Sequence, residues 1–200
     1  MKTYEKIVKF VKRKKNVITI REFKDAQIGF YYINKLIEDN YISRIGKGLY
    51  GKSDSFEDEY FIIQNRYKNA IFSYNTALFF INKTEVTPNI IVITIPNDYN
   101  VKTIDTKQIR VHYTSRDNIN LGAIEVRSPF GNTIKAYNLE RTICDIVKNE
   151  SRNGPDIEQR NKVIKRVFAN NEIDGTTIIN YSKKLKCEKK IRAIIDVMIW

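Results

Sequence analysis

The chain of 200 residues is 42% hydrophobic and 12% aromatic, enough for one large or two small folded domains, which excludes wholesale disorder. The net charge of the chain is +12, and residues 1–52 hold 13 basic and 5 acidic residues. The positive charge of this segment favours binding to a phosphate backbone. The alternative is that it serves solubility alone. No apolar run has the length of a membrane helix, and Lys9 and Lys12 interrupt the N-terminal apolar residues, so we expect a cytoplasmic protein without a signal peptide.

The first fifty residues have the pattern of a winged helix-turn-helix. Apolar spacing predicts helices over residues 3–14, 19–24 and 30–39, with a brief strand at 17–18. Thr19 and Glu22 have the spacing of a capping box, which should start the second helix. Two β-prone stretches then flank Gly46-Lys47-Gly48, where glycine permits the positive φ of a tight turn. Three helices and a basic hairpin predict a DNA-binding domain over residues 1–54.

The third predicted helix has an apolar face and a polar face. We expect the apolar face to pack inward through Phe30, Ile33, Leu36 and Ile37. The outward face carries hydroxyl, amide and ammonium groups that can bond to base edges in a major groove. Its residues are Tyr31, Tyr32, Asn34 and Lys35, and Gln27 lies in the preceding turn. Packing of one tyrosine against the wing or the second domain is the alternative. In the hairpin, we expect Arg44 and Lys47 to contact phosphate or the minor groove.

The remaining residues predict an α+β second domain over 55–200, a mixed sheet with helices over 55–137 and a helical part over 138–200. The first part should contain helices 57–66 and 74–82 and strands 89–95, 108–114, 123–127 and 133–137, with Pro96 stopping the first strand. The second part should contain helices 139–149, 157–169, 176–185 and 188–199. Its basic runs are either solvated helix faces or a second nucleic-acid contact: Lys162, Lys165, Arg166, Lys183, Lys184, Lys186, Lys189 and Lys190.

Signals for catalysis or metal binding are weak. His112 is the only histidine and lies in an alternating strand, where a structural role is expected. Asp105 and Glu125-Val126-Arg127 have the carboxylate spacing of metal-dependent nucleases. Such a site normally has a lysine at the position that Arg127 occupies here. Cys144 and Cys187 lie far apart without a CxxC motif and are expected to be core or surface thiols. We therefore expect no enzyme, no metal and no cofactor.

One helix in the last third carries charges of both signs. Glu140 and Asp145 are expected to pair with Arg141 and Lys148 along the predicted helix, in a structural role. Two alternatives to a DNA-binding regulator stay open. One is a nuclease with a winged-helix targeting domain, and the other is a transcription factor that senses a ligand in its second domain.

Three segments resemble the AbiEi antitoxins of the AbiE abortive-infection system, a bacterial type IV toxin–antitoxin pair. Residues 18–52 resemble the winged helix of that family, and residues 72–88, with Thr76-Ala77-Leu78, resemble the helix that opens its second domain. The most specific match is Tyr-Asn-Leu-Glu-Arg-Thr-Ile-Cys-Asp at residues 137–145. The chain departs from the family in having Gly29 and Phe30 in place of a polar cap and a basic residue, and Asn82 in place of glycine.

The resemblance implies two activities in one chain. The N-terminal domain would repress its own operon by binding inverted repeats in the promoter. The C-terminal domain would neutralise a nucleotidyltransferase toxin without forming a tight complex, and the protein could be a monomer that binds DNA cooperatively. Toxin neutralisation rests on the resemblance alone, whereas the residues themselves also favour DNA binding.

Overall fold

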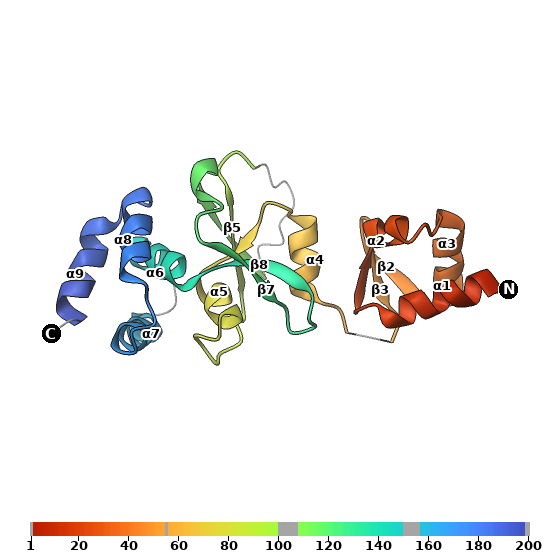
Figure 1. The fold of residues 1–200 in the computed structure, drawn as a ribbon, viewed down its shortest axis with the longest axis horizontal. Coiled ribbons are helices and arrows are strands. Elements are labelled where there is room, and N and C mark those ends of the chain that lie inside the picture. The colour runs from red at the N-terminus through yellow and green to blue at the C-terminus, as the bar shows by residue number, and fades with distance from the viewer. Residues whose placement is uncertain (1, 55, 100–107, 150–156, 199–200) are drawn as a thin grey trace. The chain divides into compact units, whose positions relative to one another are not determined.

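A computed structural model describes residues 2–54, 56–99, 108–149 and 157–198 (Figure 1). The chain divides into two compact units, one of Met1–Lys68 with Arg127–Ile134 and one of Asn69–Val126 with Lys135–Trp200. No helix in the described part of the chain is long and apolar enough to cross a membrane. Asp105, named above for its nuclease-like spacing, lies outside the described residues.

The N-terminal elements follow the expected order of a winged helix-turn-helix. They are α1 (Lys2–Arg13), β1 (Val17–Thr19), α2 (Ile20–Asp25), α3 (Phe30–Glu38), β2 (Ile42–Gly46) and β3 (Leu49–Lys52). The strands form one antiparallel sheet in the order β1-β3-β2. Thr19 and Glu22 form the expected capping box, in which each side chain bonds to the other residue's backbone N–H. The predicted winged helix is thus confirmed.

The helices of this unit pack around a small aromatic and aliphatic core. Phe23, Ile33 and Leu36 are fully or almost fully buried, as their spacing predicts. Phe30 was expected on the same face, and that expectation is wrong because 64% of the residue is exposed. Phe30 is the first residue of α3, where a side chain leans back beyond the helix start. Gly29 precedes it and offers no side chain to pack against.

Residues beyond the expected boundary at 54 join this first unit. Asp58 is fully buried and caps α4 (Glu59–Arg66) by accepting the Phe61 N–H at 3.1 Å. Its other carboxylate oxygen accepts bonds from Ser128 Oγ at 2.5 Å and Asn132 Nδ2 at 2.6 Å. One carboxylate therefore holds together two segments 70 residues apart. The independence of residues 1–54 and 55–200 in solution stays a prediction.

A mixed five-stranded sheet in the order β6-β5-β4-β8-β7 follows in the described residues. Its strands are β4 (Ile71–Phe72), β5 (Ile91–Pro96), β6 (Ile109–Thr114), β7 (Ala123–Arg127) and β8 (Thr133–Tyr137), with a 3-10 turn at Arg116–Asn118. Strand β5 is antiparallel to β4 and parallel to β6. Pro96 was expected to stop β5 but is its last residue. The strand tolerates it because the next N–H, from Asn97, donates to the Thr114 carbonyl at 2.9 Å.

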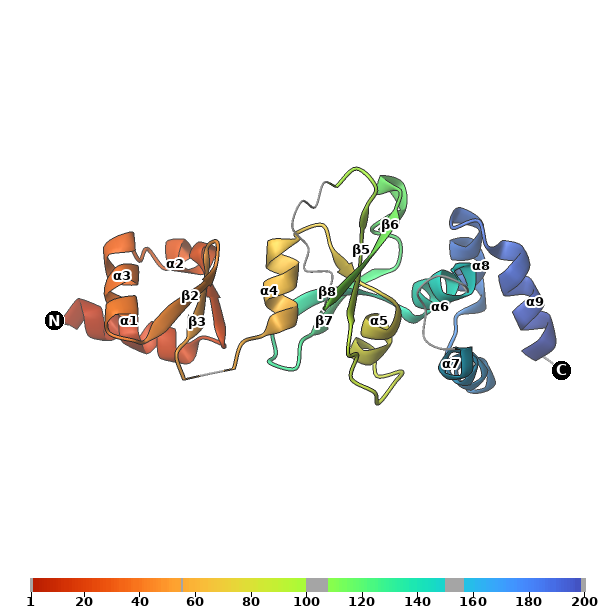
Figure 2. The same ribbon diagram turned by 180° about the vertical axis from the view of Figure 1, so that it is seen from behind.

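The C-terminal part is helical, as expected, and completes an α+β fold. The helices of this unit are α5 (Tyr74–Phe80), α6 (Leu139–Lys148), α7 (Ile157–Ala169), α8 (Gly175–Lys184) and α9 (Glu188–Met198). Figure 2 shows α6 next to α8 and α9, and their shared core includes Ile143, Ile178 and Ile191, all completely buried. Asn82, singled out in the sequence, has a φ of 56°, a conformation that asparagine tolerates better than most residues.

Candidate nucleic-acid interface

The turn between α2 and α3 sets the direction of the third helix. Gln27 adopts a left-handed φ of 56°, and Ile28 then turns inward, where its N–H donates to the Phe23 carbonyl at 2.8 Å. The buried Ile28 side chain anchors the turn, so the exposed Gln27 side chain is left beside the start of α3.

Two expected recognition residues on α3 point away from the core. Tyr31 is 72% exposed, and Asn34 is exposed one turn further along the same helix. Exposed Phe30 precedes Tyr31, so the helix begins with two adjacent aromatic rings in solvent. Phe30 was not expected on this face because its apolar character suggested burial. A phenol, an amide and an aromatic face together suit base edges and thymine methyl groups.

The other two expected residues support this face by packing on α1. Tyr32 is half-buried, with its ring 6.3 Å from the Tyr4 ring and 5.2 Å from the Tyr31 ring. Lys35 Nζ lies 4.7 Å from the centre of the same Tyr4 ring, within cation–π range. The Tyr4 hydroxyl donates to Asp39 Oδ2 at 2.5 Å. Tyr4 on α1 therefore holds Tyr32 and Lys35 in place beside the outward face.

The wing is fixed to the start of α2. The Ile20 N–H donates to the Gly48 carbonyl at 2.7 Å, and a Cβ on Gly48 would lie 2.9 Å from Ile20 Cγ2. Gly48 also has a φ of +71°, so glycine is needed there both for space and for backbone conformation. Lys47 is exposed at the tip of this turn, and Arg44 is exposed on β2. Both cations are free to reach a phosphate backbone.

Further cations gather on α1. Lys6, Lys9, Arg13 and Lys14 line an open pocket of about 520 Å³ together with Phe10. Lys14 is also paired with Glu22 at 2.8 Å. The positive charge of this segment was evident from the sequence, but its position on one surface of the helix was not.

Residues 5–51, which contain this geometry apart from Tyr4, match the family model described as the AbiEi antitoxin transcriptional regulator. The winged helix is therefore similar to that of AbiEi antitoxin regulators. The resemblance inferred from the sequence is confirmed by this match. No curated protein matches the chain in sequence.

The fold of nearly the whole chain is similar to that of the RV2827C protein from Mycobacterium tuberculosis. The two structures share a TM-score of 0.65 at 11% sequence identity, over 97% of this chain and 76% of the other. At that identity the similarity concerns the fold, and it extends beyond the AbiEi winged helix into the second unit.

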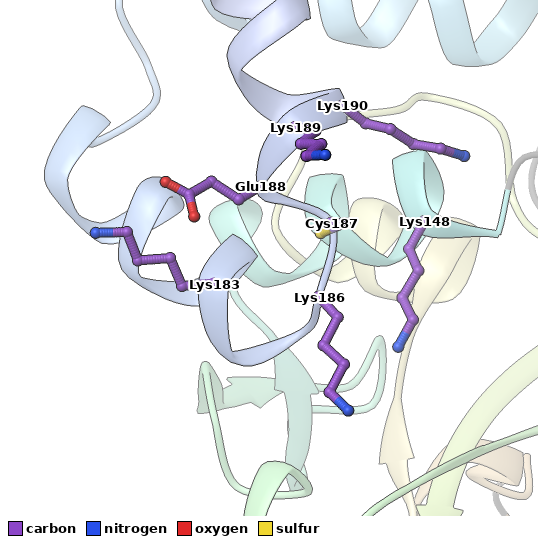
Figure 3. A pocket seen from close by; sticks show the side chains of 7 residues that line it. All are labelled: Lys148, Lys183, Lys186, Cys187, Glu188, Lys189 and Lys190. Atoms are coloured by element: carbon purple, nitrogen blue, oxygen red, sulfur yellow. The ribbon is translucent and has the colours of Figure 1, made fainter.

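The C-terminal basic residues outside the AbiEi match do not form one surface. Arg166 on α7 donates to the Lys83 carbonyl, whereas Lys162, Lys165 and Lys184 are exposed. Figure 3 shows a separate pocket of about 380 Å³ around the turn between α8 and α9. It is lined by Lys148, Lys183, Lys186, Cys187, Glu188, Lys189 and Lys190. The structure thus adds Lys148 to four of the lysines expected from sequence.

The only histidine packs as a structural residue. The His112 ring stacks on Tyr74 with centroids 4.1 Å apart, and its Nε2 has no hydrogen-bond partner among the described residues. Burial, with a smaller effect from Arg110, lowers the pKa of His112 to about 4. The ring is therefore neutral at physiological pH. Within the described residues, no three histidine, cysteine or acidic side chains could hold a metal ion together.

Helix α6, which begins within the 137–145 segment singled out in the sequence, is largely buried. Arg141 is 1% exposed and binds Asp145 at 2.9 Å, the pairing expected along this helix. Arg141 Nη1 also donates to the Asn118 and Leu121 carbonyls at 2.6 and 2.9 Å. Burial raises the pKa of Asp145, while the Arg141 guanidinium opposes that rise. The network connects α6 to the segment before β7.

The other two charged residues of α6, Glu140 and Lys148, are directed to other segments. Glu140 accepts the backbone N–H of Asp174 at 3.2 Å, and Lys148 lines the pocket of Figure 3. Both side chains lie at the helix surface, where partners from other segments compete with partners on the same helix.

Proposed function

We propose that this protein is a cytoplasmic AbiEi antitoxin that represses its own operon by binding inverted repeats in the promoter. The exposed face of α3, in a segment that matches AbiEi transcriptional regulators, is the observation that carries the proposal. In the second part of the proposed function, the protein neutralises a nucleotidyltransferase toxin without forming a tight complex. The proposal assigns no catalytic residue.

The DNA contacts divide between two elements. Helix α3 enters the major groove, where Gln27, Tyr31 and Asn34 reach base edges. Arg44 and Lys47 of the wing contact phosphates and set the position of the domain without reading sequence. Tyr32 and Lys35 act through Tyr4, because their packing on α1 holds the reading face in place.

A binding and cleavage assay on the operon's own promoter tests the first activity. The full chain should protect inverted repeats from nuclease digestion and bind that DNA far more tightly than a scrambled fragment of equal length. The DNA should stay intact when Mg²⁺ is added. Equal affinity for both fragments would contradict sequence-specific repression, and metal-dependent cutting would favour the nuclease alternative.

Co-expression with the neighbouring nucleotidyltransferase tests the second activity. Wild-type protein should restore growth, and purified toxin and antitoxin should elute separately in gel filtration. Tyr31→Ala should still restore growth while it derepresses a promoter–reporter fusion, since Tyr31 contacts no residue of the second unit in our proposal. Loss of rescue in this variant would show that neutralisation needs the DNA-binding face.

A further inference from the structure

The two cysteines of the chain meet in the C-terminal core. Cys144 lies on α6 and is completely buried, whereas Cys187 lies just before α9 and is 5% exposed. Cys187 Sγ is 3.8 Å from the Cys144 carbonyl, and Cys144 Sγ is 3.8 Å from the Ile178 carbonyl. Cys187 Sγ therefore lies against the backbone of Cys144, a residue 43 positions away in the sequence.

Only one of the two thiols reaches solvent-accessible space. Cys187 lines the pocket of Figure 3, where the side chains around it include Lys148, Lys186 and Lys190. Interaction with the Cys144 thiol lowers the pKa of Cys187, and Lys148 and Lys190 lower it further, whereas burial and the Asp145 carboxylate raise it. An accessible thiol among cations has the surroundings of a reactive cysteine. The same interaction between the thiols, together with burial, raises the pKa of Cys144, which keeps its proton.

We propose that Cys187 is a peroxide-sensitive thiol and that Cys144 resolves its oxidised form into a disulfide. The Cys187 thiolate attacks one oxygen of a hydroperoxide, the O–O bond breaks, and the product is a sulfenic acid with release of water or alcohol. Cys144 sulfur then attacks Cys187 sulfur and displaces the hydroxyl group, which leaves as water with the Cys144 proton. Two thiols are oxidised and one peroxide is reduced.

The disulfide would join α6 to the turn between α8 and α9. Disulfides in reducing compartments are usually transient and act in catalysis or redox sensing, which fits a pair that is free in this structure. The bond would close a loop of more than forty residues around α7 and α8 and so restrict the helical part. The proposal needs neither DNA binding nor toxin neutralisation to be correct.

Mass spectrometry on the full-length protein tests the pair. After treatment with hydrogen peroxide, the mass should fall by two hydrogen atoms, both thiols should disappear from thiol titration, and one peptide pair should join Cys144 to Cys187. Reduction should restore the starting mass. Retention of both thiols, or a linkage between two chains instead of within one, would overturn the proposal.

Two single variants separate the roles of the cysteines. Cys144→Ser should stop at a sulfenic acid on Cys187, which dimedone traps, and Cys187→Ser should leave Cys144 reduced. Reaction at Cys144 in the second variant would refute the assignment. Lys148→Gln should slow oxidation of otherwise wild-type protein, while Lys68→Gln, a change at another exposed lysine, should not. The linkage map of the wild-type protein decides the matter if a cysteine variant fails to fold.

Discussion

Helices α3 and α6 both carry residues by which the chain resembles AbiEi antitoxins, but they use them in opposite ways. Helix α3 leaves Phe30 and Tyr31 64% and 72% exposed, so its first turn is available to a partner. Helix α6 buries Arg141 and Asp145 and uses their charges in an internal network. The more specific sequence motif therefore lies on α6, where it has a structural role. The less specific winged-helix pattern contains α3, which carries the proposed binding surface.

Replacement of Arg141 should have the largest effect. Arg141→Ala leaves the Asp145 carboxylate buried without its partner and frees the Asn118 and Leu121 carbonyls. We expect the free energy of unfolding in urea to fall by about 3–5 kcal/mol. Arg192→Ala is the matched control, because it breaks a pair of the same spacing with Glu188 at the surface and should cost less than about 1 kcal/mol. Equal decreases would refute the contrast between buried and exposed pairs.

Replacement of Tyr31 should weaken DNA binding without unfolding the protein. Tyr31→Ala should reduce the free energy of promoter binding by about 1–3 kcal/mol, measured by fluorescence anisotropy, because it removes the side chain proposed to bond to a base edge. Tyr113→Ala removes a similarly exposed tyrosine, at 61%, from the second unit and should leave affinity unchanged. Tyr32→Ala should lower both affinity and stability because Tyr32 packs on Tyr4. An unchanged affinity in folded Tyr31→Ala would remove α3 from the interface.

Changes in the wing should be smaller and independent of sequence. Arg44→Ala and Lys47→Ala should each reduce the slope of log affinity against log salt by about one, because each variant lacks one cation that binds phosphate. Lys68→Ala removes the same charge as Lys47→Ala outside the wing and should leave the slope unchanged. A change in sequence preference, observed with either wing variant, would mean that the wing reads bases.

The last prediction concerns the pH dependence of stability. His112 has a native pKa of about 4 against an ordinary value of 6.5, so below pH 6.5 the unfolded chain binds a proton that the native chain does not. Stability should therefore be unaffected by His112 above pH 6.5 and should decrease as the pH falls from 6.5 towards 4. Urea unfolding of His112→Gln should lack this decrease. A decrease equal to that of the wild type would assign it to carboxylates instead.

Local patterns predicted most of the elements of this fold. Capping residues and apolar periodicity act within one or two turns, which is why the Thr19 cap and nearly every helix boundary could be read from the sequence. Strand β4 has two residues and no periodicity to detect. It exists because Phe72 pairs with Ala136, far along the chain.

The parts of the site that were not predicted depend on contacts between distant segments. The position of Tyr4 beneath Tyr32 and Lys35 needs α1 to cross α3, and the contact of Cys144 with Cys187 needs the packing of three helices. Phe30 was placed inward because apolar residues usually are, but its position at the helix start overrides that rule. Sequence patterns specify which face is polar and leave open which polar residues are also used in packing.

The separation of reading from packing on α3 has an evolutionary consequence. Gln27, Tyr31 and Asn34 are exposed, so under the proposed function exchanges at these positions would alter the operator that is bound and would leave the core of Phe23, Ile33 and Leu36 intact. Duplicated operons within one cell would then diverge in their regulation by single substitutions, each of which leaves the protein folded. Crosstalk between duplicated copies would disappear quickly under such conditions, while the scaffold that both copies inherit stays the same.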